Sequence, residues 1–119
     1  MDNVENSRPE LWKPADICEA LGCDPSAAGF DDFVELCHRI ALKWVDSGAQ
    51  RAVLARTVDE MCVARNTFPR AFYQKIKRAV KPVLEADDET LAALGVRLEK
   101  RTSSELAYCL AYILEKYRS

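Results

Sequence analysis

Residues 57–84 predict a short helix, a tight turn and a longer helix, and they read TVDEMCVARNTFPRAFYQKIKRAVKPVL. In the first of these helices, Val58, Met61 and Cys62 fall on one side, because residues three and four positions apart share a helix face. Asn66 suits the end of that helix, since asparagine tolerates the left-handed backbone that a helix C-terminus often needs. This stretch predicts a helix-turn-helix, and the other segments are interpreted around it.

The second helix of the motif, expected over about residues 68–81, has two different faces. We expect Thr67 to cap it and Pro69 to lie in its first turn, where amide hydrogens have no helical partner. Six apolar side chains recur at helical spacing and are expected to be buried: Phe68, Phe72, Ile76, Ala79, Val80 and Val83. Five polar or basic side chains fall on the opposite side: Arg70, Gln74, Lys77, Arg78 and Lys81.

Charge is distributed unevenly along the chain. Between Met61 and Leu84 there are six basic residues and no Asp or Glu. The six are Arg65, Arg70, Lys75, Lys77, Arg78 and Lys81. The whole chain carries a formal net charge of −2, so the remainder carries −8. A cationic helix on an acidic protein favours a phosphate backbone as partner, whereas the alternative is an ordinary solvated helix face.

Length and composition set the limits of the fold. A chain of 119 residues fits one domain with one core. Hydrophobic content of 49% and charged content of 30% are typical of a globular protein and exclude a disordered one. No apolar run approaches the ~20 residues of a membrane span, and no basic-then-apolar leader opens the chain, so we predict a cytoplasmic protein without membrane association. Five scattered cysteines predict buried thiols rather than a disulfide framework.

The N-terminal segment divides into an arm and a helix. Residues 1–13 are polar and lack periodicity, so we expect a flexible arm there, followed by a single helical domain over residues 14–119. A short helix is expected from Ala15 to Leu21, and Gly22 stops it.

A turn and a long helix follow. The turn CDPSAAG, residues 23–29, leads into a helix expected from about Phe30 to Val45. Asp31 and Asp32 lie in its first turn, where negative charge suits the helix dipole. Its apolar stripe comprises Phe30, Phe33, Val34, Cys37, Ile40, Ala41, Trp44 and Val45, and Ser47 and Gly48 end it.

The remaining segments complete an all-α prediction. Residues 50–56 are expected to form a short helical lead into the motif. Asp87 or Asp88 can cap a short helix that reaches Leu94, and Gly95 closes it. Ser103 or Ser104 caps the last helix, whose inward stripe is Leu106, Cys109, Leu110, Ile113, Leu114 and Tyr117. No segment reads as a strand, so we predict a compact bundle of about six helices containing a helix-turn-helix.

Catalytic and metal-binding alternatives find little support in the sequence. Cys18 and Cys23 with Cys37 and His38 lack the C-x2-C spacing of a zinc site and would draw ligands from separate helices. Cys37 and His38 cannot act as a nucleophile and base pair, because consecutive helical side chains point about 100° apart. Gly-rich phosphate loops and hydrolase motifs are absent from the sequence. We predict a protein that is not an enzyme and uses no metal or cofactor.

Three segments of the chain carry a resemblance to a known family. The first, residues 17–40, reads ICEALGCDPSAAGFDDFVELCHRI, the second is the helix-turn-helix string TVDEMCVARNTFPRAFYQKIKRAV, and the third, residues 94–114, reads LGVRLEKRTSSELAYCLAYIL. In order and in local strings, including the Thr-x-Ser-Glu from Thr102 to Glu105, they resemble the C-terminal DNA-binding effector domain of the sporulation-initiation response regulator family of endospore-forming bacteria. The resemblance covers about residues 15–117.

This resemblance implies a transcription regulator whose second motif helix enters the major groove of double-stranded DNA, with members acting as pairs on repeated sites. Gln74, Lys77 and Arg78 occupy positions where the family presents its DNA-facing residues. Ala71 stands where the family has an arginine, and Tyr73 where it has a glutamate. The family also carries a receiver domain ahead of this module, so the resemblance is to a divergent, stand-alone member.

Each side chain of the exposed face has an expected role. Arg70, Lys77 and Lys81 are expected to neutralise phosphates, which position the helix without reading bases. Gln74 can pair with adenine and Arg78 with guanine. The full predicted DNA-binding set is Thr67, Arg70, Tyr73, Gln74, Lys77, Arg78 and Lys81.

Two expectations remain open on the sequence alone. Tyr73 either packs on the sugar-phosphate backbone or is half-buried in the domain. Pro82 should kink or end the second motif helix, because proline removes an amide hydrogen.

The rival to DNA binding is a protein-interaction module, derived from a DNA-binding fold that no longer reads DNA. It would dock on another protein through Trp12, Trp44 or Tyr73.

Overall fold

The computed structural model describes residues 14–43, 50–93 and 95–118, and their regular secondary structure is entirely helical, as predicted. The helices are α2 (Pro14–Ala20), α3 (Phe30–Leu42), α4 (Gln50–Arg65), α5 (Pro69–Glu85), α6 (Asp88–Ala93) and α7 (Ser103–Arg118). The predicted arm, the expected positions of Trp12, Trp44, Val45 and Leu94, and the stop at Ser47 and Gly48 lie outside the described residues, as does the side chain of Tyr117.

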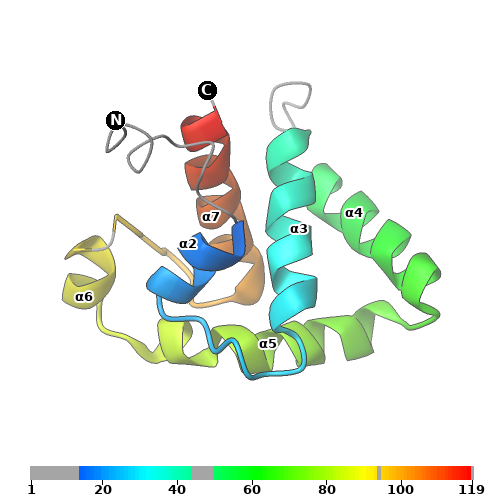
Figure 1. The fold of residues 1–119 in the computed structure, drawn as a ribbon, viewed down its shortest axis with the longest axis horizontal. Coiled ribbons are helices and arrows are strands. Elements are labelled where there is room, and N and C mark those ends of the chain that lie inside the picture. The colour runs from blue at the N-terminus through cyan, green and yellow to red at the C-terminus, as the bar shows by residue number, and fades with distance from the viewer. Residues whose placement is uncertain (1–13, 44–49, 94, 119) are drawn as a thin grey trace, which may run out of the picture.

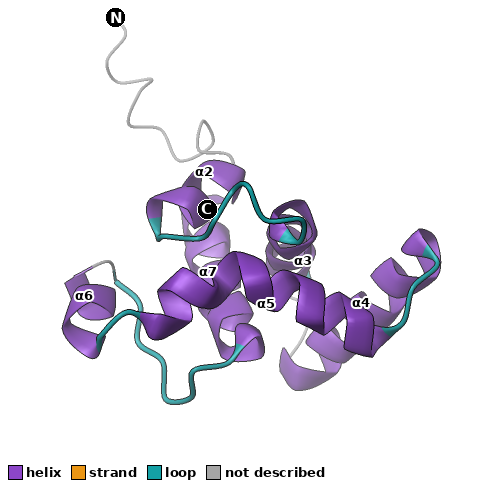
Figure 2. Ribbon diagram, turned by 90° about the horizontal axis from the view of Figure 1, so that it is seen from below, coloured by secondary structure: helices purple, strands orange, loops and turns teal. Residues whose placement is uncertain are grey.

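Helices α3 and α7 stand side by side and form the most extensive contact among the described helices (Figure 1). Helix α5 runs across one end of this pair, α4 leans against α3, and α2 packs on α3 from the other side. Seen from below in Figure 2, α5 lies nearest the viewer, and no helix of the described residues crosses its outer side. The fold therefore presents one long helix on an open face.

The core lies where α3, α5 and α7 meet. Helix α3 contributes five members of its predicted stripe, Phe30, Phe33, Cys37, Ile40 and Ala41, whereas Val34 is only half-buried and Leu36 is buried in addition. Helix α7 contributes Leu106, Leu110 and Leu114, and the small Ala107 and Ala111 beside them are also buried.

Several helix ends follow the predicted signals and others do not. Helix α4 is continuous from Gln50, so residues 50–56 are its first turns rather than a separate lead. The carboxylate of Asp87 accepts a hydrogen bond of 2.7 Å from the amide of Thr90 and caps α6, as predicted. The cap of α7 is Thr102, whose hydroxyl accepts from the Glu105 amide at 3.2 Å, and not Ser103 or Ser104.

The turn between α2 and α3 is held against the backbone of α5. A Cβ atom placed on Gly29 would lie 2.1 Å from the carbonyl oxygen of Lys75 and 2.8 Å from the Cα atom of Ile76. Nearby, the amide of Asp24 donates a hydrogen bond of 2.8 Å to the carbonyl of Ala79. The start of α3 therefore touches the middle of α5 main chain to main chain, and only glycine fits at the point of contact.

We expect Gly29→Ala to lower the free energy of unfolding by about 2–3 kcal/mol, because the new methyl group must displace the α5 backbone. Gly95→Ala is the matched control. Gly95 has a left-handed φ of 82°, but no atom lies within 4 Å of its added Cβ, so only the left-handed cost of about 1–2 kcal/mol applies. Urea unfolding of both variants measures the difference. Equal losses would show that the contact with α5 is not tight.

Candidate nucleic-acid interface

A three-residue turn joins α4 to α5. Asn66 has a φ of 55°, the left-handed conformation expected of it. Its amide donates to the carbonyl of Val63 at 3.2 Å, and the amide of Thr67 donates to the carbonyl of Cys62 at 3.0 Å. This pair of bonds is a Schellman motif, which satisfies the last carbonyls of α4 and fixes the direction in which the chain leaves it. The local geometry fits a helix-turn-helix.

The start of α5 differs from the prediction at two residues. Phe68, not Thr67, is the N-cap, and no side chain caps the helix. Phe68 was expected to be buried but is 77% exposed. The reason is its extended backbone, with φ −114° and ψ 152°, which places it before the helix and outside the helical period. Pro69 then occupies the first turn, as predicted.

The inner face of α5 agrees with the predicted stripe from Phe72 onward. Phe72, Ile76, Ala79, Val80 and Val83 are buried. Pro82 does not end the helix, which continues to Glu85. Because proline has no amide hydrogen, the carbonyl of Arg78, four residues earlier, has no helical partner. Pro82 and Arg78 are both exposed, so water can satisfy this carbonyl.

The outer face of α5 is polar and open. Arg70, Gln74, Lys77, Arg78 and Lys81 are all exposed, as predicted. Within the described residues, the cations Arg70, Lys77 and Arg78 make no ion pair. The amino group of Lys81 lies 4.0 Å from the exposed Glu85 carboxylate. The most exposed part of the helix therefore carries cationic groups that remain available to an anion.

Tyr73 and Thr67 differ from the other members of the predicted set because both are partly buried. The ring of Tyr73 meets the edge of Phe72, with centroids 6.2 Å apart. Burial, with smaller contributions from Asp59 and Cys62, raises the pKa of the Tyr73 hydroxyl. The half-buried alternative for Tyr73 is therefore the one observed, and its side chain belongs in part to the α4–α5 packing.

Two of the six basic residues in the motif are neutralised inside the protein. Asp32, at the start of α3 and only 7% exposed, accepts a hydrogen bond of 2.8 Å from Nε of Arg65. The same carboxylate lies 3.3 Å from Nζ of Lys75. Glu35 accepts from Arg65 as well. The sequence pattern explains Asp32 only by the helix dipole, because Arg65 is 33 residues away and no local signal predicts this bridge.

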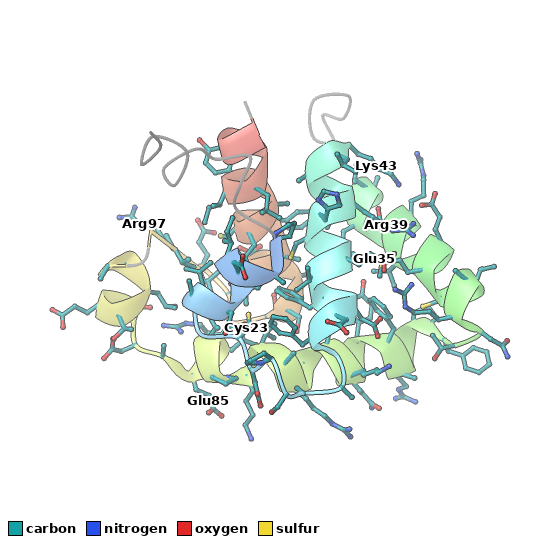
Figure 3. The ribbon with its side chains drawn as sticks, viewed as in Figure 1. Cys23, Glu35, Arg39, Lys43, Glu85 and Arg97 are labelled. Atoms are coloured by element: carbon teal, nitrogen blue, oxygen red, sulfur yellow. The ribbon has the colours of Figure 1, made fainter. Side chains whose placement is uncertain are left out.

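The side of α3 that carries Glu35 faces α4 (Figure 3). Arg39, one helical turn on, lies 2.7 Å from the Glu35 carboxylate, and Lys43 reaches the carboxylate of Glu60 on α4 at 3.1 Å. Partial burial on its own would raise the pKa of Glu35, but the hydrogen bonds from Arg65 and Arg39 outweigh it and lower that pKa. Ion pairs therefore hold α4 against α3 along its length.

A seventh cation joins the interface from a distant part of the chain. Arg101 precedes α7, and its guanidinium donates to the carbonyls of Leu84 and Ala86 and to the carboxylate of Asp88. It therefore satisfies carbonyls at the C-terminal end of α5, an end that carries no basic residue of its own. Sequence reasoning missed Arg101, because nothing local links it to α5.

An open groove runs beside the C-terminal half of α5. It has a volume of about 670 Å³ and is lined by Gln74, Lys77, Arg78, Lys81, Leu84, Glu85 and Arg101. Figure 3 shows Glu85 at this end of the helix. Four cations and one carboxylate surround the groove, so it favours an anionic occupant.

Four of the five cysteines form part of the core, and Cys109 is only half-buried. Cys18, Cys23, Cys37 and Cys62 are buried free thiols. The hydrogen bond with Cys23 lowers the pKa of Cys18, but the hydrogen bond with Cys37 and burial outweigh it and raise that pKa. His38 is exposed. In the part of the chain that the structure describes, no three His, Cys, Asp or Glu side chains gather as a metal site.

Comparisons with protein-family models, with curated proteins and with solved structures find no match to this chain. The resemblance to the sporulation response regulators therefore depends only on the sequence strings that carry it. Among the described helices, none combines the length and apolar character needed to cross a bilayer.

Asp32→Asn should lower the free energy of unfolding by about 1–2 kcal/mol, since it leaves Arg65 and Lys75 without their shared carboxylate while both keep some solvent contact. Asp31→Asn, at the exposed neighbouring position, is the control and should cost less. Chemical denaturation measures both. If the two variants lose equal stability, the bridge contributes nothing beyond the helix-start charge.

The lowered pKa of Glu35 predicts a pH-dependent contribution to stability. Because the folded-state pKa lies below the unfolded value of about 4.3, the contribution is complete above that pH and disappears as pH falls through the folded-state pKa. Glu35→Gln should therefore be less stable than the parent at pH 7, and the gap should close in acid. Glu99→Gln, exposed and without an ion pair in the described residues, should show no such trend. A gap that persists or widens in acid would contradict this assignment.

Proposed function

We propose that this chain is a sequence-specific DNA-binding transcriptional regulator, non-enzymatic and cytoplasmic, and that α5 lies in the major groove. The observation that supports this most strongly is the uncovered outer face of α5, on which Arg70, Lys77, Arg78 and Lys81 are exposed on a chain of net charge −2. An α-helix fits the width of the major groove, and exposed cations on it meet phosphates on both sides.

Roles divide along the helix. Arg70, Lys77 and Lys81 neutralise phosphates and set the position of α5. The amide of Gln74 presents a donor and an acceptor suited to adenine, and the guanidinium of Arg78 presents two donors suited to guanine, at about 1–3 kcal/mol of discrimination each. Thr67 lies at the turn, and its amide is committed to the Cys62 carbonyl, so its hydroxyl is the group left for a backbone contact.

The internal ion pairs support the same proposal. Asp32 and Glu35 lie close to the motif and would repel a phosphate backbone if they were unpaired. Arg65 and Lys75 neutralise them within the protein. The charge that α5 presents outward is therefore positive, although the chain as a whole is acidic.

A protein-interaction module is the second candidate. Val63 in the last turn of α4 and Phe68 at the end of the α4–α5 turn, which are 82% and 77% exposed, favour it. A protein partner would cover these apolar side chains. Such an apolar contact would not need the cations of α5. Tight stoichiometric binding to a protein, with no affinity for any duplex, would establish this alternative in place of DNA binding.

Fluorescence titration of the purified chain with pooled duplexes at several salt concentrations tests the DNA proposal. Lys77→Ala should weaken binding to all duplexes and reduce the slope of log affinity against log salt by about 0.9. Arg78→Ala should weaken binding by about 1–3 kcal/mol and relax the preference for guanine. Arg97→Ala is the matched control, because Arg97 is exposed but lies away from α5 (Figure 3). Binding that is unchanged in the double variant Lys77→Ala/Arg78→Ala would remove α5 as the DNA-binding element. Sedimentation of the complex reports whether two copies bind together.

A further inference from the structure

Four large hydrophobic side chains of the described residues are substantially exposed: Leu42, Val63, Phe68 and Tyr112. Phe68 is the largest side chain among those that adjoin the α4–α5 turn. The core is complete without Phe68, because the buried side chains of α5 begin at Phe72. The ring of Phe68 is therefore placed outward by the backbone and has no role in folding that the contacts reveal.

The backbone around Phe68 is held rigidly. The Schellman motif at Asn66 fixes the chain before it, and Pro69 fixes the φ angle after it. The carbonyl of Phe68 accepts a hydrogen bond of 2.9 Å from the Phe72 amide, the first of the helix. The ring is thus presented from a preorganised position at the N-terminus of α5, the end from which recognition helices contact base edges.

The chemistry of the ring limits what it can recognise in that position. A phenyl group neither donates nor accepts a hydrogen bond, so it cannot distinguish the polar edges of guanine, adenine and cytosine. The major groove offers one distinctive apolar group, the 5-methyl of thymine. Arg70, two residues further on, is exposed and cationic, which favours a nucleic acid over an apolar protein surface beside this ring.

We propose that Phe68 is a specificity-determining residue that reads the 5-methyl group of a thymine, an inference that rests on the proposed DNA binding. Phe68 and Gln74 are six residues apart, about 9 Å along the helix axis, which corresponds to roughly three base pairs. The thymine therefore lies within about three base pairs of the adenine assigned to Gln74.

Replacing single thymines with deoxyuridine, which lacks only the methyl group, tests the assignment. Duplexes selected from a random library by the full chain supply the target, and each thymine is replaced in turn. We expect one or two positions to lose about fourfold in affinity, the free-energy value of one buried methyl-sized group. Phe68→Ala should bind the thymine and deoxyuridine duplexes equally, because the methyl group no longer has an apolar partner.

Leu42→Ala is the matched control, since Leu42 is also an exposed hydrophobic residue but lies at the far end of α3 from α5 (Figure 1). It should keep the full difference between thymine and deoxyuridine. Circular dichroism confirms folding of both variants, and Gln74→Ala locates the adenine contact.

Three outcomes would overturn the assignment. A wild-type chain that binds selected duplexes with no effect of deoxyuridine would leave the proposed function intact and remove thymine reading. A deoxyuridine effect that survives in Phe68→Ala would assign the methyl contact to another residue. A folded chain that selects no duplex, or a protein complex that requires Phe68 in place of DNA, would overturn the proposed function as well.

Discussion

One buried carboxylate, that of Asp32, connects the three helices on which the motif depends. It belongs to the first turn of α3, and it contacts Arg65 at the end of α4 and Lys75 in the middle of α5. Two helices joined by a short turn can adopt many crossing angles, so a turn alone does not determine how α5 is presented. The shared carboxylate limits that freedom by fixing both helices to the same point of α3.

The same bridge reduces the positive charge that the motif exposes to solvent. Six basic residues without an acid between Met61 and Leu84 indicate a strongly cationic segment, but Arg65 and Lys75 serve as counterions for acids of α3. The positive surface is consequently narrower than the sequence suggests, and it is confined to the outer face of α5. Arg101 lines the same groove as Lys81, but its guanidinium is paired with Asp88 and with the carbonyls at the end of α5.

The apolar faces of the helices were largely predictable, whereas contacts between segments far apart in the sequence were not. The stripes of α3 and α5 follow the helical period, so Phe33, Ile40, Ile76 and Val83 are buried as expected. Phe68 breaks the pattern because it precedes the helix, and Pro82 is tolerated because it faces solvent. Asp32 and Arg101 act over long sequence separations, where periodicity carries no information. Exposure of the α5 side chains was predicted, whereas their binding of DNA stays a prediction.

Because Gly29 contacts the backbone of α5, the outer side chains of that helix are not needed to hold it in the fold. Main-chain contacts and the buried stripe hold α5 in place. Substitutions at Gln74, Lys77 or Arg78 therefore change the exposed surface of the helix without changing its position in the fold. The domain is therefore a natural scaffold for retargeting: a library varied at these outward positions should yield folded members throughout, each with its own ligand preference.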